Sequence, residues 1–275
     1  MNETTGARYP PNTGQWHAGG SWSGKKSGEN DGMTPDLLPR LAHAEATGHS
    51  RFGTWGEVAR FGPLVAVFAG PDLPVNTAWH DGSAPLTKAD LEAFETFSAA
   101  HGQPATLHVL SHAAPSLLPL LRARGYVLDF LLHVHTHDLT ALPPFPALNV
   151  QASPEADAWA ALSARGFGPG TERMMRLVAH APGTHLLTAL VDAQPVAAAA
   201  LSVQEGVAAL YGTSTLPEFR ERGAQTALLA ARLHLAKERG AHFASVFVAP
   251  GSGSERNVRR AGFGLAGVRL TFRKR

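Results

Sequence analysis

The chain has 275 residues and a formal net charge of +2, with 44% hydrophobic and 17% charged residues, which fits a globular protein long enough for two ordinary domains. It has no cysteine, which excludes disulfides, thiolate metal sites and a cysteine nucleophile. It also lacks a run of about 18 apolar residues and the basic-then-apolar order of a signal peptide, so we expect a cytoplasmic protein without a membrane span.

The first half of the chain shows a polar tail followed by alternating helices and strands. Residues 1–32 are rich in Gly, Ser, Asn and Thr without apolar periodicity, so we expect a disordered tail. Thr34 and Pro35 are typical of a helix start, with Thr34 as the cap. The pattern then predicts a helix at 34–47, a strand at 62–69, a helix at 86–102, a strand at 106–110, a helix at 115–124 and a strand at 126–139.

A proline-rich connector at residues 143–147 is predicted to separate this half from the next. Ser153 and Thr171 are expected to cap two helices in the second half. The predicted elements are a strand at 148–152, helices at 153–165 and 171–181, strands at 185–191, 195–203 and 207–215, a helix to about 239, a strand at 243–248, a short helix and a strand at 264–273. This order does not repeat as a doubly wound βαβ unit would.

Positive charge is concentrated at the C-terminal end. From Pro217 onward there are twelve Lys and Arg residues against four acidic ones, which suggests a polyanionic partner. A nucleic acid is not expected, because no interleaved aromatic residues and no nucleic-acid-binding motif accompany the charge. A solvated basic surface without a ligand is the plainer interpretation.

The turn after the strand at 207–215 carries the clearest chemical signal, Leu216-Pro-x-x-Arg220-x-x-Gly223-Ala-Gln225. A helix start leaves backbone N–H groups free and partly positive, which suits a phosphate, and Gly223 lets backbone approach a ligand closely. The segment resembles the acyl-CoA-binding motif of the GNAT N-acetyltransferase superfamily, although Gln225 replaces a small residue. The resemblance implies that CoA is bound by Ser214, Thr215, Leu216, Arg220, Glu221, Arg222, Gly223, Ala224, Gln225 and Thr226.

A second stretch, Pro250 to Phe263, resembles the later motif of the same superfamily, in which an Asn-bearing helix ends in Gly-Phe. The resemblance places Asn257 at the CoA arm, and it places Val258 where many members carry a tyrosine that acts as general acid. Residues 148–275 therefore resemble one GNAT domain. The segment Leu121 to Tyr126 echoes the end of this motif, which indicates a weak internal repeat.

The resemblance implies an α/β fold of two GNAT-like subdomains in tandem, each a mixed, mainly antiparallel sheet flanked by helices. Residues 33–142 form the degenerate subdomain, because they contain no cofactor cradle. The implied function is transfer of an acetyl group from acetyl-CoA to a primary amine of a small molecule or peptide. The alternative is a catalytically silent CoA-binding or protein-interaction module, which Val258 and Gln225 suggest.

The catalytic residues are the least determined part of the prediction. Glu172 is the candidate base, because it opens a helix after a flexible loop, although an acid there also stabilises a helix start. His185, Glu205 and Tyr211 are other candidates, and Ser254 is a candidate proton route. His133, His135 and His137 share one strand face, but no accompanying ligand is evident, so we expect no metal.

Overall fold

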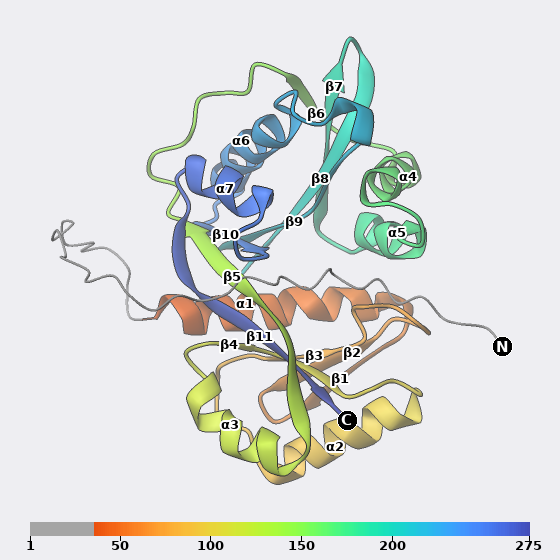
Figure 1. Ribbon diagram of the computed structural model, residues 1–275, viewed down its shortest axis with the longest axis vertical. Coiled ribbons are helices and arrows are strands. Elements are labelled where there is room, and N and C mark those ends of the chain that lie inside the picture. The colour runs from red at the N-terminus through yellow and green to blue at the C-terminus, as the bar shows by residue number, and fades with distance from the viewer. Residues whose placement is uncertain (1–35) are drawn as a thin grey trace, which may run out of the picture. The chain divides into compact units, whose positions relative to one another are not determined.

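The computed structural model describes residues 36–275, which form one compact unit (Figure 1). The predicted tail at 1–32 and the predicted cap at Thr34 lie outside the described residues. The first half of the described chain contains α1 (Leu37–Ser50), η1 (Arg51–Trp55), β1 (Glu57–Phe61), β2 (Leu64–Phe68), β3 (Ala78–His80), α2 (Lys88–Ala100), β4 (Thr106–Leu110), α3 (Ala114–Ala123) and β5 (Tyr126–His137).

The second half begins after the proline-rich connector. It contains β6 (Asn149–Ala152), α4 (Ala156–Phe167), α5 (Glu172–His180), β7 (Thr184–Val191), β8 (Gln194–Gln204), β9 (Val207–Thr215), η2 (Pro217–Phe219), α6 (Ala224–Glu238), β10 (Phe243–Val248), α7 (Gly253–Arg260) and β11 (Gly264–Lys274). The predicted α/β fold with a mixed sheet flanked by helices is confirmed. Among residues 36–275, no helix is both long and apolar enough to cross a membrane.

The eleven strands found among residues 36–275 belong to one sheet, in the order β1-β2-β3-β4-β11-β5-β10-β9-β8-β7-β6. Only two neighbouring pairs, β3 with β4 and β9 with β10, are parallel within the described residues. Each half contains three antiparallel strands followed by a helix, a parallel strand, a second helix and a last strand, and the second half has one further antiparallel strand, β6, at its start. The two halves thus repeat one order of elements, which supports the proposal of two GNAT-like subdomains.

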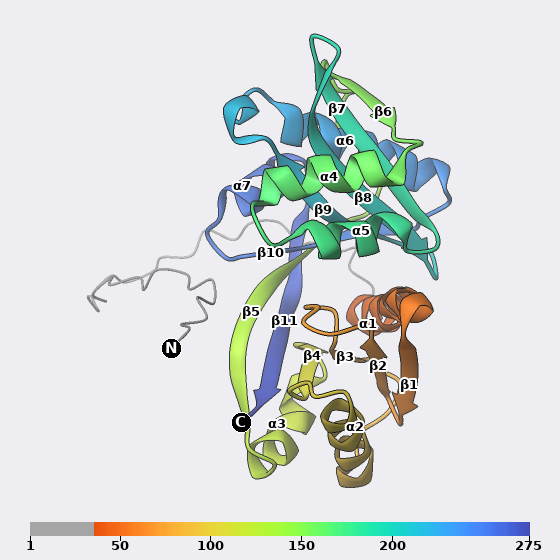
Figure 2. The same ribbon diagram turned by 90° about the vertical axis from the view of Figure 1, so that its right-hand side faces the viewer.

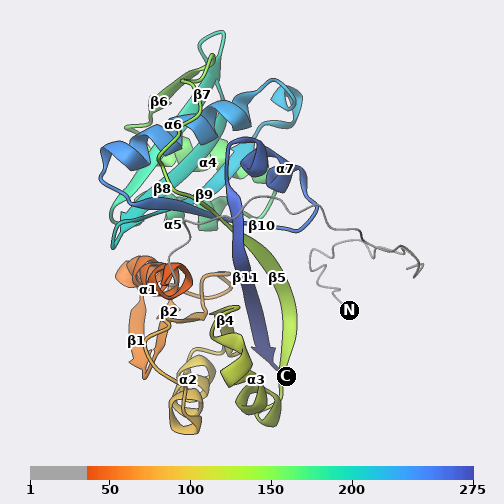
Figure 3. The same ribbon diagram turned by 90° about the vertical axis from the view of Figure 1, so that its left-hand side faces the viewer.

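The last strands of the two halves change places. β11, the end of the chain, lies between β4 and β5, whereas β5 from the first half lies between β11 and β10. β11 pairs with β5 from Gly264↔Thr136 to Lys274↔Tyr126, so the two strands run side by side through both halves (Figures 1–3). Each half therefore depends on a strand supplied by the other.

Helices cover both faces of the second half. α4 and α5 pack on one face of β7–β9, and α6 packs on the other (Figures 2 and 3). The core beneath α6 contains Leu201, Leu228, Leu233 and Val258, while Trp159 of α4 is buried on the opposite face. Trp159 Nε1 also donates to Leu187 O at 3.0 Å, which fixes α4 on the sheet.

The structure differs from the predicted elements in two strands and two caps. β1 and β3 were missed, because β3 has only three residues and β1 is an exposed edge strand with little apolar pattern. The predicted cap at Ser153 is wrong, because α4 starts later and the Ser153 hydroxyl bonds Thr188 Oγ1. Thr171 stands at the start of α5, but its hydroxyl donates to Gly168 O at 2.8 Å rather than capping the helix.

Candidate active site

The parallel strands β9 and β10 separate part of the way along β9. They pair from Phe243↔Val207 to Ser245↔Ala209, and β9 then continues to Thr215 paired only with β8. A cleft of about 740 Å³ opens beyond this point, between the end of α4, the turn before α6, and α7. Its lining residues are Gly166, Phe167, Thr213, Ser214, Thr215, Phe219, Arg220, Glu221, Gly223, Ala224, Gln225, Thr226, Gly253, Arg256, Asn257 and Arg260.

The N-terminus of α6 faces this cleft, and no side chain among residues 36–275 accepts a hydrogen bond from its backbone N–H groups. Gly223 occupies the N-cap position with φ 81°, a left-handed conformation that favours glycine, and no side chain caps the helix. The equivalent crossover helix of the first half, α2, is closed by its own residues: Thr87 and Asp90 form a reciprocal capping box. The Asp90 carboxylate thus occupies the helix start in the first half, whereas the α6 start is available to an anion.

Three arginines add positive charge to the cleft. Arg220, Arg256 and Arg260 line it together with one acid, Glu221. Arg220 Nη2 also donates to Gly166 O at 3.4 Å, so it connects the turn to the end of α4. Arg222 is not among the lining residues, and its guanidinium lies 5.2 Å from the ring centroid of Phe219.

The strand side of the cleft contains a buried polar atom without a partner. Thr215 Oγ1 is buried and makes no hydrogen bond within the described residues. Its neighbour Ser214 donates to Ser163 O at 3.0 Å. Gly166 lets α4 approach this strand, because a Cβ there would lie 2.6 Å from Ser214 Oγ. Leu216 is buried in the core and does not line the cleft.

Gln225 and Asn257 meet across the cleft floor. Asn257 Nδ2 donates to Gln225 Oε1 at 2.7 Å, which joins the first turn of α6 to α7. The side chain that replaces a small residue in the motif therefore bonds to the asparagine of the second motif. Nine of the eleven residues predicted to bind CoA line this one cleft, all except Leu216 and Arg222.

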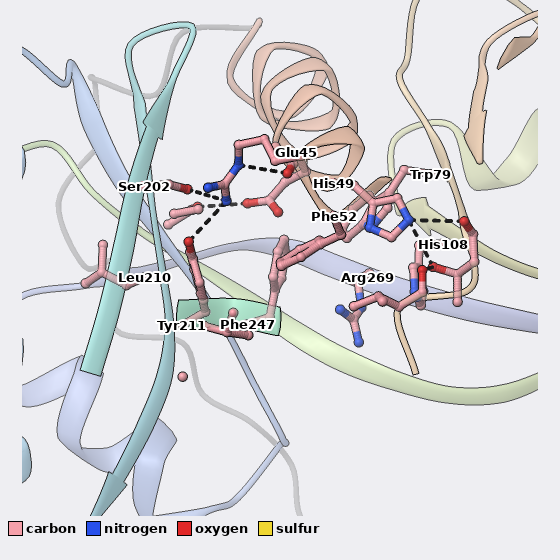
Figure 4. A pocket seen from close by; sticks show the side chains of 18 of the residues that line it. Glu45, His49, Phe52, Trp79, His108, Ser202, Leu210, Tyr211, Phe247 and Arg269 are labelled. Carbon is pink, nitrogen blue, oxygen red and sulfur yellow. Dashed lines mark hydrogen bonds between the residues drawn. The ribbon is translucent and has the colours of Figure 1, made fainter. Parts of the chain in front are cut away.

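A second cavity, of about 410 Å³, lies between the two halves on the other side of β9 (Figure 4). Residues of both halves line it, and six of them are aromatic: Phe52, Trp79, Phe130, Phe167, Tyr211 and Phe247. Phe167 lines both this cavity and the cleft, and Gly212 and Thr213 are consecutive residues of β9 that line one each. The two cavities therefore adjoin at β9.

A carboxyl group lines this cavity. Glu45 of α1 accepts a hydrogen bond from Ser245 Oγ at 3.2 Å. Burial raises the pKa of Glu45 from 4.5 to about 7, and the Ser245 bond and the charges of Arg269 and Arg51 offset only part of this rise. Burial lowers the pKa of His49, one helical turn further along, to about 4, so its ring is uncharged at neutral pH.

Arg51 and Tyr211 form a network along the edge of the cavity. Arg51 donates to Ser202 Oγ at 2.9 Å and to Tyr211 Oη at 3.1 Å, as well as to three other oxygens. The Tyr211 hydroxyl also bonds Thr184 Oγ1 at 3.0 Å. The donors of Arg51 are thus occupied within the protein, and this arginine joins the first half to β8 and β9.

A buried arginine supports the irregular part of β9. The register between β8 and β9 shifts between Ala198↔Ser214 and Ala200↔Tyr211, which takes Gly212 and Thr213 out of one-to-one pairing. Arg232 of α6 donates to Ala200 O at 3.3 Å and Tyr211 O at 3.4 Å, directly beside this bulge. Sequence reasoning missed Arg232, which lies on a helix that otherwise faces the core.

The predicted catalytic residues lie outside both cavities. Glu172 is exposed at the start of α5, and Ser254 is exposed on α7. Val258 is 4% exposed and packs in the core beneath α6. Of the other candidates, Tyr211 lines the cavity between the halves, whereas His185 and Glu205 line neither space. Sequence analysis did not single out Glu45, because nothing in its helical surroundings distinguishes it from other helix residues.

The histidines of β5 divide into two kinds of contact. Glu255 Oε1 lies 2.6 Å from His133 Nδ1 and 3.1 Å from His135 Nε2, and the ligand atoms of these three side chains lie within 4.8 Å of one another. His137 Nδ1 instead accepts from Leu139 N at 3.0 Å. Hydrogen bonds to His133, to Gly251 N and to His135 lower the pKa of Glu255 to about 2. Glu255 is the acid that sequence analysis did not connect with the histidine run.

The candidate site thus consists of a mixed sheet that opens beside a free helix start, with a second cavity next to the opening. Residues 155–263 match the model of the acetyltransferase (GNAT) family. The resemblance inferred from the two motifs is therefore confirmed over this segment.

Solved structures share the fold over most of the chain. A GCN5-related N-acetyltransferase from Kribbella flavida is 21% identical, with a TM-score of 0.71 over 88% of this chain and 96% of that one. A GNAT-family acetyltransferase structure from Novosphingobium aromaticivorans is 17% identical, with a TM-score of 0.57 over 88% and 100%. A tandem GNAT protein of the clavulanic acid biosynthesis pathway, solved without AcCoA, is 18% identical, with a TM-score of 0.54 over 76% and 77%. No curated protein matches the sequence significantly.

Proposed function

We propose that the protein is an N-acyltransferase that moves an acetyl group from acetyl-CoA to a primary amine. The observation that carries the proposal is the pair of adjoining cavities at β9. One has an uncapped helix start and three arginines, and the other has a carboxyl group whose pKa is raised to about 7. An acyl donor in the first and an amine in the second would meet at Gly212 and Thr213.

The cleft fits the phosphate-bearing arm of CoA. The amides of the α6 start and the Arg220 guanidinium would hold the pyrophosphate, and Arg256 and Arg260 supply further charge. Thr215 Oγ1 is a buried polar atom that a ligand in the cleft would satisfy. Asn257 would act through Gln225, by holding α7 against the first turn of α6.

Acetyl-CoA supplies an activated thioester, and the chain has to stabilise the charge that develops on its carbonyl oxygen. A backbone amide from the bulge at Gly212 and Thr213 is our proposed donor, because these residues are out of regular register with β8 and lie at the junction of the cavities. Arg232 would hold the bulge in place through its bonds to Ala200 O and Tyr211 O.

Glu45 is our proposed general base. An aliphatic amine has an ordinary pKa near 10, so most of it is protonated at neutral pH, and transfer requires removal of a proton. A base works best with a pKa near the working pH, and Glu45 meets this condition at about 7. Glu172 and Ser254 stay predictions from sequence and have no role in this proposal, since neither lines either of these two cavities.

Among residues 36–275 no tyrosine lines the cleft, and Val258 holds the position that the family resemblance gives to a tyrosine acid. Val258 lies in the core, and we propose that the departing thiolate takes its proton from water or from the amine itself. A thiol has an ordinary pKa near 8.5, so its thiolate needs only a weak acid. The proposal therefore assigns the cofactor to residues 148–275 and assigns none to 33–142, where Asp90 closes the corresponding helix.

The experiment is calorimetric titration with acetyl-CoA, followed by thiol release over a panel of amines. Wild type, Glu45→Gln and Glu238→Gln are compared; Glu238 is an exposed acid at the far end of α6 and serves as the control. We expect all three to bind acetyl-CoA and only Glu45→Gln to lose turnover. Binding by wild type without turnover of any amine would favour the silent CoA-binding module instead.

A further inference from the structure

Arg269 is a partly buried cation without a hydrogen-bond partner among residues 36–275. It lies on β11, lines the cavity between the halves, and makes no hydrogen bond or ion pair with any residue from 36 to 275. Its Nε is fully buried, and its Cζ lies 5.3 to 5.8 Å from the ring centroids of Phe247, Phe130 and Trp79. Figure 4 shows it among the side chains around the cavity.

A charged group in this position is costly unless something pairs with it. Burial lowers the pKa of Arg269 to about 10, and the nearby Glu45 charge offsets part of this effect, so Arg269 remains a cation at neutral pH. The three aromatic rings give a favourable cation–π environment but accept no hydrogen bond from the planar donor fork. A guanidinium presents this fork to carboxylates in a two-point contact.

Apart from Glu45, the polar groups that the structure describes around the cavity do not act as hydrogen-bond or charge partners of the Arg269 guanidinium. His49 donates to Thr77 O at 3.1 Å, and His108 bonds Thr271 Oγ1 at 3.0 Å. Burial lowers the pKa of both imidazoles, so neither carries charge at neutral pH. Arg51 has its donors occupied by the protein. Within the described residues, the cavity therefore offers one free cation and one base, and its other walls combine aromatic, aliphatic and methionine side chains with a few neutral polar ones.

We propose that the acceptor is a small amino carboxylate with an apolar body, whose carboxylate pairs with Arg269 while its amine faces Glu45. The cavity of about 410 Å³ has the size of a small-molecule site. The apolar body would pack between Phe247, Phe52 and Trp79. This inference rests on the proposed function in one respect only, which is that the cavity holds the acceptor.

Binding of a carboxylate probe tests the inference without any turnover. The full chain is titrated calorimetrically with 3-phenylpropionate and with 3-phenylpropan-1-ol, and then with hexanoate and hexan-1-ol. Each pair shares one apolar body and differs in the anionic group. A hydrogen-bonded charge pair is typically worth enough to favour each acid by about 10-fold or more. Arg269→Met should remove this preference, and Arg269→Lys should keep part of it, because a lysine retains charge without the fork.

Arg273→Met is the matched control. Arg273 lies on the same strand but pairs with Asp129 at 3.0 Å on the surface, outside the cavity, so its loss should leave the acid preference unchanged. Thermal unfolding of each variant reports whether it folds. If Arg269→Met does not fold, the wild-type comparison of acid and alcohol and the Arg269→Lys variant still decide the question.

Two results would overturn the inference: equal or absent binding of acid and alcohol by wild type, or undiminished acid preference in Arg269→Met. A turnover arm compares phenylalanine with phenethylamine and with a dipeptide amide. Faster transfer to the amines that lack a carboxylate would overturn the inference while leaving the proposed acyl transfer intact. Preference for the acid probes without transfer to any amine would instead contradict the proposed function alone.

Discussion

Replacing Glu45 with glutamine should reduce activity and increase stability at the same time. Glutamine keeps the shape of the side chain and can accept the bond from Ser245, but it cannot take a proton from the amine. Loss of a positioned general base typically costs ~10²–10⁴-fold in rate. We therefore expect kcat/KM to fall by at least about 100-fold in Glu45→Gln, with acetyl-CoA affinity unchanged.

The pH dependence follows from the raised pKa of Glu45, about 7. The base works only when ionised, so wild-type kcat/KM should rise with pH and level off above about 7, and near pH 6 roughly a tenth of the enzyme would carry the ionised base. The rise should be absent from the residual activity of Glu45→Gln.

The stability effect has the opposite sign. Because the folded protein holds this proton more tightly than the unfolded chain does, the Glu45 contribution to stability falls as pH rises from about 4.5 to about 7. The full change corresponds to at most ~3 kcal/mol, and less where the cavity admits water. Glu45→Gln should therefore unfold at a higher temperature than wild type at pH 8 and show little of this gain at pH 4.

Steady-state thiol release between pH 5.5 and pH 9 and thermal unfolding at pH 4 and pH 8 together test the reasoning. A Glu45→Gln variant with wild-type turnover and the same pH profile would refute the role of Glu45 as base. Lower stability of this variant at pH 8 would refute the assignment of a raised pKa.

Three further predictions concern the cleft and the sheet. Gly223→Val should abolish CoA binding in calorimetry, because Gly223 has φ 81° at the helix start, where a side chain would strain the backbone that faces CoA. Gly240→Val is the control: Gly240 lies beyond the other end of α6 with φ 76°, so this variant should have a similar backbone strain and keep CoA affinity. Val258→Tyr should lower the free energy of unfolding by ~1–3 kcal/mol by overpacking the core, seen in urea titrations, and should not raise turnover. A fragment of residues 148–275 should not fold alone, as judged by circular dichroism, because it lacks β5 between β10 and β11. Adding a fragment of residues 36–147 should restore folding. A cooperative unfolding transition for the fragment 148–275 by itself would contradict the strand exchange.

The sequence predicted the elements of the second half well, because its signals are local. The turn from Leu216 to Gln225 and the helix after it follow from residue types at fixed spacing, and the free helix start is where the motif placed it. Ser214 and Thr215 could be placed for the same reason, as neighbours of the turn. Even the unusual Gln225 has a visible partner, Asn257, which the second motif had singled out.

The second cavity could not be predicted, because it depends on contacts between distant segments. Glu45 and Ser245 are 200 residues apart in sequence, and the exchange of β5 and β11 brings Arg269 beside aromatic side chains of both halves. The sheet order that causes this exchange leaves no local trace in the composition. Glu172 was favoured for its place at a helix start, which is a local feature and equally typical of structural acids.

One measurement tests the central claim most directly: amine-dependent release of free CoA thiol by wild type and by Glu45→Gln, at concentrations of acetyl-CoA that calorimetry shows to saturate both. The account predicts that both proteins bind acetyl-CoA equally and that only wild type transfers the acetyl group rapidly, with a rate that rises toward pH 7. Equal transfer rates for the two proteins, or saturable binding by wild type without transfer to any amine, would contradict it.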